Sequence, residues 1–149
     1  MLAGVLAFAP VSHGTVMDVC TTMMQAIAPA SGATVTIEQR LGAGGGVMRV
    51  FRLAKPIGIG AAQAEGLWEL GGSVRAVIRF SDATAAGEFA RALAEEYGQS
   101  LSPRSRADWT TYQVGLSKPF ASATTAVRGR NVQFYCSFEK SRIQEDWLE

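Results

Sequence analysis

Three arginines and a tryptophan are the residues whose types and spacing best suit a binding site. Arg75 and Arg79 are four positions apart in a strictly alternating segment, so in a strand both lie on one sheet face. Arg52 could join them from a neighbouring strand, and Trp68 could add a stacking surface. Because guanidinium groups bind carboxylates and phosphates bidentately, we predict a site for a small anionic ligand. The alternative is an exposed sheet face with ordinary surface salt bridges.

Two glutamates suggest a different chemistry. Glu65 and Glu69 are four apart and flank Trp68 in the sequence. Carboxylates held about 5–10 Å apart act as acid and base in glycoside hydrolysis. An alternative prediction is therefore a histidine-free hydrolase that acts on a sugar or a cell-wall polymer. The adjacent Glu95 and Glu96 are interpreted as a solvated helix face.

The scarcity of histidine and cysteine restricts catalysis and metal binding. His13 is the only histidine and falls within a predicted signal peptide, so serine–histidine and cysteine–histidine mechanisms are not expected. Two distant cysteines cannot supply the soft ligands of an ordinary zinc site. The run Gly42–Gly46 is followed by Val47 instead of the Lys-Ser/Thr of a phosphate loop, so we interpret it as a flexible hairpin connection. We predict no catalytic residue, no metal and no cofactor.

The first fourteen residues predict an export signal. They are apolar from Leu2 to Ala9, and Ser12 and Gly14 are small residues before a cut ahead of Thr15. No positive residue precedes the apolar run, as expected if the true start codon lies upstream of Met1. The run is too short to span a bilayer, so we expect no stable membrane insertion after its removal. We predict a periplasmic or secreted protein; in the cytoplasmic alternative, residues 2–9 begin a buried strand or helix.

The two cysteines predict one disulfide. Cys20 lies on the apolar side of a predicted helix, and Cys136 alternates inward with Val132, Phe134 and Phe138 in a predicted strand. Both side chains then point to the core, and an even cysteine count in a small exported protein favours a bridge. Two separate buried thiols are the alternative.

The elements that position these residues follow from apolar periodicity and turn residues. Helices are predicted over 15–28 and 83–97, and strands over 33–40, 47–54, 74–80, 109–114, 124–127 and 132–138. Pro56 is expected to end the second strand, and the glycine-dotted segment 57–73 fits either a loop or a short element. The predicted fold class is α+β: one domain over 15–149, with an antiparallel sheet of about five to six strands and two main helices packed on one face.

A short internal echo raises the question of duplication. Leu53–Ile57 (LAKPI) resembles Leu116–Phe120 (LSKPF), and the offset of 63 also places the first helix near the second. If the echo is real, the domain consists of two α-β-β-β units. Chance similarity in a chain rich in alanine and glycine is the alternative.

Charge and composition complete the functional expectation. A net charge of +1 gives no field that would attract nucleic acid. The leading prediction is a small exported binding or accessory protein without enzymatic activity, whose partner is an unknown protein or a small anionic ligand. The hydrolase described above and an inhibitor or immunity-type protein that binds another protein remain the alternatives.

Overall fold

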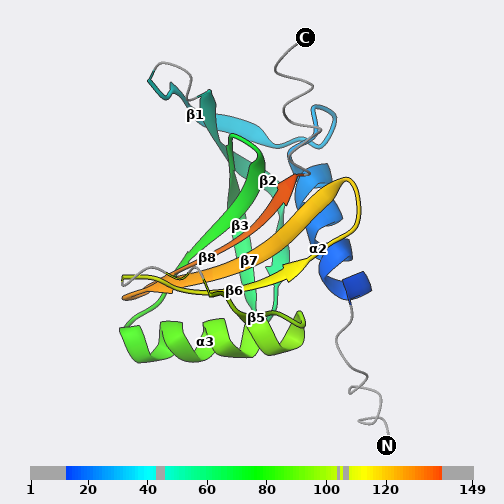
Figure 1. The fold of residues 1–149 in the computed structure, drawn as a ribbon. Helices are drawn as coiled ribbons and strands as arrows, with labels where there is room; N and C mark the ends of the chain where they lie inside the picture. The colour runs from blue at the N-terminus through cyan, green and yellow to red at the C-terminus, as the bar shows by residue number, and fades with distance from the viewer. Residues whose placement is uncertain (1–12, 43–45, 104, 106–107, 139–149) are drawn as a thin grey trace, which may run out of the picture.

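The computed structural model describes residues 13–42, 46–103, 105 and 108–138. It is mostly sheet, with two helices (Figure 1). The elements, in chain order, are α2 (His13–Ala26), β1 (Thr34–Arg40), β2 (Val47–Ile59), β3 (Ala62–Leu70), β4 (Ser73–Arg79), α3 (Ala83–Glu96), β5 (Ser100–Leu101), β6 (Thr110–Gly115), β7 (Phe120–Arg128) and β8 (Asn131–Phe138).

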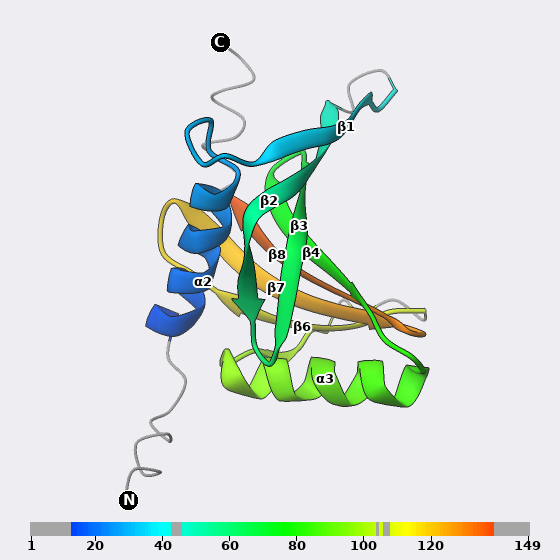
Figure 2. The ribbon, with the colours of Figure 1, turned by 180° about the vertical axis from the view of Figure 1, so that it is seen from behind.

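The predicted fold class is wrong in its sheet and in its helical layer. All eight strands form one antiparallel sheet in the order β1-β2-β3-β4-β8-β7-β6-β5, instead of five to six strands. The two helices do not form a single layer: α2 contacts β2 and β4, whereas α3 contacts β7 and β8. Figures 1 and 2 show a strongly twisted sheet with the helices running in different directions. Strand twist accumulates across eight strands, so each helix packs on a different part of the sheet.

The strand residues that the sequence did not predict, around Pro56 and Gly66, are explained by the pairing of β2 with β3. Strand β2 continues through Pro56, because its register with β3 shifts between Arg52 and Ile57. At such a bulge the backbone N–H makes no hydrogen bond to the neighbouring strand, so a proline, which has no N–H, is accommodated. The next strand, β3, contains Gly66, where an added Cβ would lie 2.8 Å from the Phe51 carbonyl oxygen. Close approach of the two backbones thus explains a glycine inside a strand, the feature that made segment 57–73 ambiguous.

The predicted disulfide is present and joins α2 to the last strand. Cys20 and Cys136 are bonded, at a sequence separation of 116, and both are fully buried. Around them the main core combines residues of both helices and the sheet, among them Val16, Met23, Phe51, Leu67, Leu93, Tyr97 and Phe134. The bridge therefore ties the first helix to the strand at the centre of the sheet.

Helix α3 shows how sequence sets an element's limits. Asp82 caps its N-terminus, where the carboxylate accepts a hydrogen bond from the Ala85 N–H at 2.8 Å. Its buried face is made of small residues and one leucine: Ala86, Ala90, Leu93 and Ala94. Small side chains let the helix lie close to β7 and β8.

The chain contains a structural repeat of one helix followed by four strands. The pair Trp68–Arg75 in β3 and β4 has its counterpart 58 residues later in the pair Ala126–Gln133 of β7 and β8, and the neighbouring pairs follow the same offset. At the centre of the sheet β4 pairs with β8, its own equivalent. The repeat thus differs from the predicted α-β-β-β units at an offset of 63: each unit has four strands, and the central hairpins are 58 residues apart.

Candidate functional site

The side chains that alternate with the core residues of β4, β6, β7 and β8 form a surface that we call the outer face. In β4 the core positions are Val74 and Ala76, so Arg75 belongs to the outer face. These four strands contain no aspartate or glutamate, and their only charged residues are Arg75, Arg79 and Arg128. The outer face of these strands is therefore positively charged and otherwise rich in hydroxyl and amide groups.

Arg75 lies in the middle of this face and is held from three sides. Its guanidinium carbon lies 4.3 Å from the centroid of the Tyr135 ring, its cross-strand neighbour on β8. Its Nη1 donates to Gln133 Oε1 at 3.0 Å. Its Nε and Nη2 donate to Ser73 Oγ at 3.3 Å and 3.0 Å. Neutral groups thus fix the orientation of a half-buried cation.

The hydrogen bonds of Arg75 leave donors for a ligand. A guanidinium has five N–H groups, and three are used, so Nη1 and Nη2 each keep one. Two neighbouring N–H groups form the fork that matches a carboxylate. Within the described part of the chain no carboxylate lies within 4.0 Å of Arg75. Burial lowers the pKa of Arg75 from its ordinary value, as expected for a cation that has lost water without gaining an anion.

An open cavity of about 540 Å³ lies beside this guanidinium. Such a volume is within the range of small-ligand sites. Trp109 also lines this cavity, and the centroid of its ring lies 4.8 Å from the guanidinium carbon of Arg128. Most lining side chains carry a hydroxyl, amide or guanidinium group; the lining comprises Arg75, Ser102, Trp109, Thr111, Gln113, Thr124, Ala126, Gln133 and Tyr135. The cavity therefore suits a polar ligand better than an apolar one.

The structure brings two of the four predicted binding residues together. Trp68 on β3 lies directly opposite Arg75 and is 36% exposed. Arg79 shares strand and face with Arg75 but lies about 13 Å further along, at strand spacing. Arg52 lies on β2, in a separate hollow with Pro56. The predicted arginine trio is thus a single central arginine with outlying neighbours.

Sequence reasoning missed Gln133 and Tyr135, the groups that hold Arg75. Their signal was present, because they alternate with Val132, Phe134 and Cys136 and so must face away from the core. What the sequence does not reveal is that β8 pairs with β4, a contact across about 60 residues. The structure also places Trp109 at this cavity.

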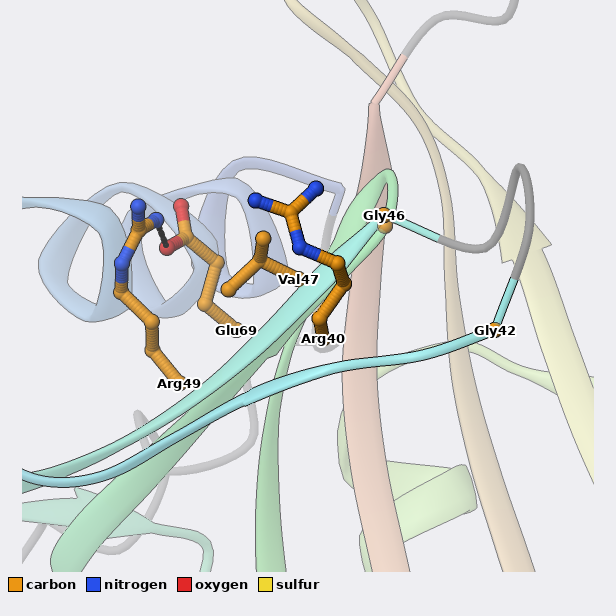
Figure 3. Close-up of a pocket in the computed structure, with 7 residues that line it drawn as sticks. Arg40, Gly42, Gly46, Val47, Arg49 and Glu69 are labelled. Carbon is orange, nitrogen blue, oxygen red and sulfur yellow. Dashed lines mark hydrogen bonds and ion pairs between the residues drawn. The ribbon is translucent and has the colours of Figure 1, made fainter.

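A second open cavity, of about 430 Å³, lies at the β1–β2 hairpin (Figure 3). Here Arg49 forms ion pairs with Glu69 at 2.9 Å and with Glu38 at 3.2 Å. The hydrogen bond with Glu69 is the main reason that the pKa of Arg49 is raised. Because Arg49 is already neutralised by two carboxylates and Arg40, the other arginine of this cavity, is exposed to solvent, the hairpin cavity is a weaker anion site than the one at Arg75.

The glutamates of the predicted hydrolase are not brought together. Glu69 is bound to Arg49, while Glu65 lines the hollow beside Arg52. Four positions along a strand correspond to about 13 Å. The buried positions of β3 also switch parity between Ala64 and Leu67, so the two carboxylates do not share one face. This pair therefore lacks the separation that glycoside hydrolysis requires.

The composition of the Arg75 cavity bears on the chemistry that it offers to a ligand. Its lining residues include no carboxylate and no histidine. The described residues also hold no cluster of three His, Cys, Asp or Glu side chains that could bind a metal. Neither of the two helices in the described ranges is long and apolar enough to cross a bilayer. The arrangement can bind and orient a ligand.

A scan against protein-family models, a search of curated proteins and a search of solved structures each find no match to this chain.

Proposed function

We propose that this protein is a binding protein whose outer face captures a polar, carboxylate-bearing small molecule at Arg75. The observation that carries the proposal is a half-buried guanidinium that faces a polar cavity and has no carboxylate partner among the described residues. A buried cation without an anion is unfavourable, and a ligand carboxylate would remove that penalty.

The hydroxyl and amide groups around Arg75 favour a sugar acid over a bare anion. Thr111, Gln113 and Thr124 line the same cavity as the guanidinium. Such groups can donate to and accept from the hydroxyls of a saccharide. Uronic acids combine those hydroxyls with one carboxylate, so they are the first probes to use.

Titration calorimetry with glucuronate, galacturonate and neutral glucose tests the proposal. We expect a uronic acid to bind and glucose to bind at least tenfold more weakly, because a hydrogen bond between charged groups contributes about 1.5–3 kcal/mol. Arg75→Gln should weaken binding to the same degree. Arg75→Lys keeps the positive charge but loses the paired N–H groups, so its affinity for a uronic acid should lie between those of the wild-type protein and Arg75→Gln.

Arg79→Gln is the matched control, since Arg79 has the same charge on the same strand and face. Thermal melts of all variants separate lost binding from lost folding. Equal affinities in Arg75→Gln and the wild-type protein would contradict the proposal, as would the absence of any uronate binding.

We further infer that the protein works in an oxidising compartment, the periplasm or the exterior, rather than in the cytoplasm. Support comes from the buried Cys20–Cys136 disulfide, since such bonds are rare in reducing compartments. The predicted signal lies largely outside the described residues, but α2 begins at His13, so a cut before Thr15 would fall within its first turn. The intact mass and N-terminal sequence of protein from its native host report both the cut and the bridge.

A further inference from the structure

The two repeats carry different surfaces on the sheet side where Arg75 lies. In the first repeat Val50 pairs with Trp68, and in the second Thr111 pairs with Ala126, its equivalent. Val77 likewise corresponds to Tyr135, which lies 58 positions later. At Val50 and Val77 the first repeat is thus apolar where the second is polar, and at Trp68 it has a large apolar side chain where the second has a small one.

The apolar side chains on this side of the first repeat are Ile37, Val50, Trp68 and Val77, which we call the strip. Ile37 is 51% exposed, Trp68 36% and Val77 38%, and each is a large apolar side chain. The first three lie opposite one another across β1, β2 and β3. Contiguous exposed apolar side chains of this kind mark binding surfaces more often than isolated ones do.

Strip and cavity meet at Arg75. One ladder position can be followed across all eight strands, through Ile37, Val50, Trp68, Arg75, Tyr135, Thr124, Gln113 and Ser100. The ladder changes from apolar to polar between Trp68 and Tyr135, and the guanidinium stands at the change. At about 4.8 Å per strand, the strip extends about 14 Å from Arg75 to Ile37.

We propose that the ligand is an amphiphile: an acidic, hydroxyl-rich head in the Arg75 cavity and an apolar tail along the strip. This inference rests on the proposed function and adds the tail to it. The positive charge of Arg75 complements the acidic head of such a ligand. The strip carries no charge, so it suits the apolar tail. An acidic glycolipid or an alkyl glycoside of a uronic acid has this chemistry.

Three probes separate the contributions of head, charge and tail: glucuronate, hexyl glucuronide and hexyl glucoside, each below its micellar concentration. We expect hexyl glucuronide to bind the wild-type protein at least about tenfold more tightly than glucuronate, because burial of several CH₂ groups favours binding. Hexyl glucoside should bind at least about tenfold more weakly than hexyl glucuronide, because it has no carboxylate.

Variants of the strip identify where the tail lies. Val50→Ser and Trp68→Ser should each reduce the gain from the hexyl chain by about threefold or more, where the gain is measured against the glucuronate affinity of the same variant. Val35→Ser is the matched control: Val35 is a valine that is 44% exposed on β1, but it pairs with the core residue Phe51. That variant should keep the full gain.

The outcomes distinguish the two proposals. If glucuronate binds through Arg75 and the hexyl chain adds nothing, the tail site is overturned and the proposed function stands. A gain that persists in both strip variants also overturns the tail site. If no uronate probe binds at all, both fail. Sedimentation velocity tests whether a second copy of the chain occupies the strip instead. A dimer that dissociates in the Trp68→Ser variant would assign the strip to that second copy and overturn the tail site.

Discussion

Ala76 on β4 lies directly opposite Phe134 on β8, and these two residues occupy the same position in the two repeats. An approximate twofold axis therefore passes between them. Arg75 and Gln133 are also equivalent, and they are hydrogen bonded to each other across this axis at 3.0 Å. The candidate site thus lies where the two repeats meet.

Substitution of Ala76 tests the packing at the axis. Ala76 and Phe134 are fully buried, so Ala76→Leu inserts atoms where no space is left. We expect a loss of about 1–3 kcal/mol in unfolding free energy, measured by urea denaturation. Val77→Leu, at the exposed neighbouring position, should change it by less than about 0.5 kcal/mol. Equal losses would contradict close packing at the axis.

Two glycines with left-handed backbone provide a matched pair. Gly60 has φ +60° and a Cβ there would lie 2.5 Å from Leu93 Cδ1, whereas Gly129 has φ +57° and open space around it. Gly129→Ala should lose about 1–2 kcal/mol from backbone strain alone. Gly60→Ala should lose at least about 1 kcal/mol more, since Leu93 is buried. Chemical denaturation measures the loss of unfolding free energy in both variants. Similar losses would show that the Leu93 side chain moves aside without cost.

A buried polar network joins the end of α3 to β7. Gln99 Nε2 donates to the Ala123 carbonyl at 3.1 Å, and Thr125 Oγ1 donates to Gln99 Oε1 at 2.6 Å. Gln99→Leu leaves the buried Thr125 hydroxyl without this partner and should cost about 1–3 kcal/mol in unfolding free energy. Adding Thr125→Val removes that hydroxyl and should restore part of the loss. A double variant less stable than Gln99→Leu would contradict this account.

The disulfide should contribute strongly to stability. It closes a loop across most of the chain, for which the chain-entropy model gives about 5 kcal/mol. Reduction of the disulfide, or the double substitution Cys20→Ser with Cys136→Ser, should therefore lower the free energy of unfolding by a similar amount, measured by chemical denaturation. Alkylation of denatured protein should modify no cysteine before reduction and two after it. Two reactive thiols without reductant would show that the bridge does not form.

The predicted binding has a simple pH dependence. Burial lowers the pKa of Arg75, but a guanidinium stays protonated at neutral pH. The lining residues include no histidine or carboxylate, so affinity for a uronate should be constant between about pH 6 and 9. It should fall below about pH 4, where the ligand carboxylate takes up its proton. Calorimetry across this range would reveal any group titrating near neutrality.

Local pattern predicted much of this structure, and long-range pairing accounts for what it missed. The strict alternation around Arg75 located β4 to within one residue. The apolar periodicity of the segment after β4 located α3 equally well. Alternation also placed Cys136 toward the core, which gave the disulfide. In contrast, the bulge that admits Pro56 depends on how β2 meets β3, information that no single segment carries.

The site was predicted in part for the same reason. Arg75 was recognisable because a strand with outward arginines is visible in one segment. The partners that make it a site, Tyr135 and Gln133, are brought beside it only by the β4–β8 pairing. Glu65 and Glu69 show the converse, because a regular spacing in sequence was broken by an irregular strand.

A titration of ¹⁵N-labelled protein with glucuronate, followed by amide chemical shifts, tests the central claim most directly. Binding at Arg75 predicts shifts concentrated at Thr111, Thr124, Gln133 and Tyr135, with none in the Arg75→Gln variant. Shifts concentrated instead around Arg40 and Arg49 at the β1–β2 hairpin, or no shifts at millimolar glucuronate, would contradict it.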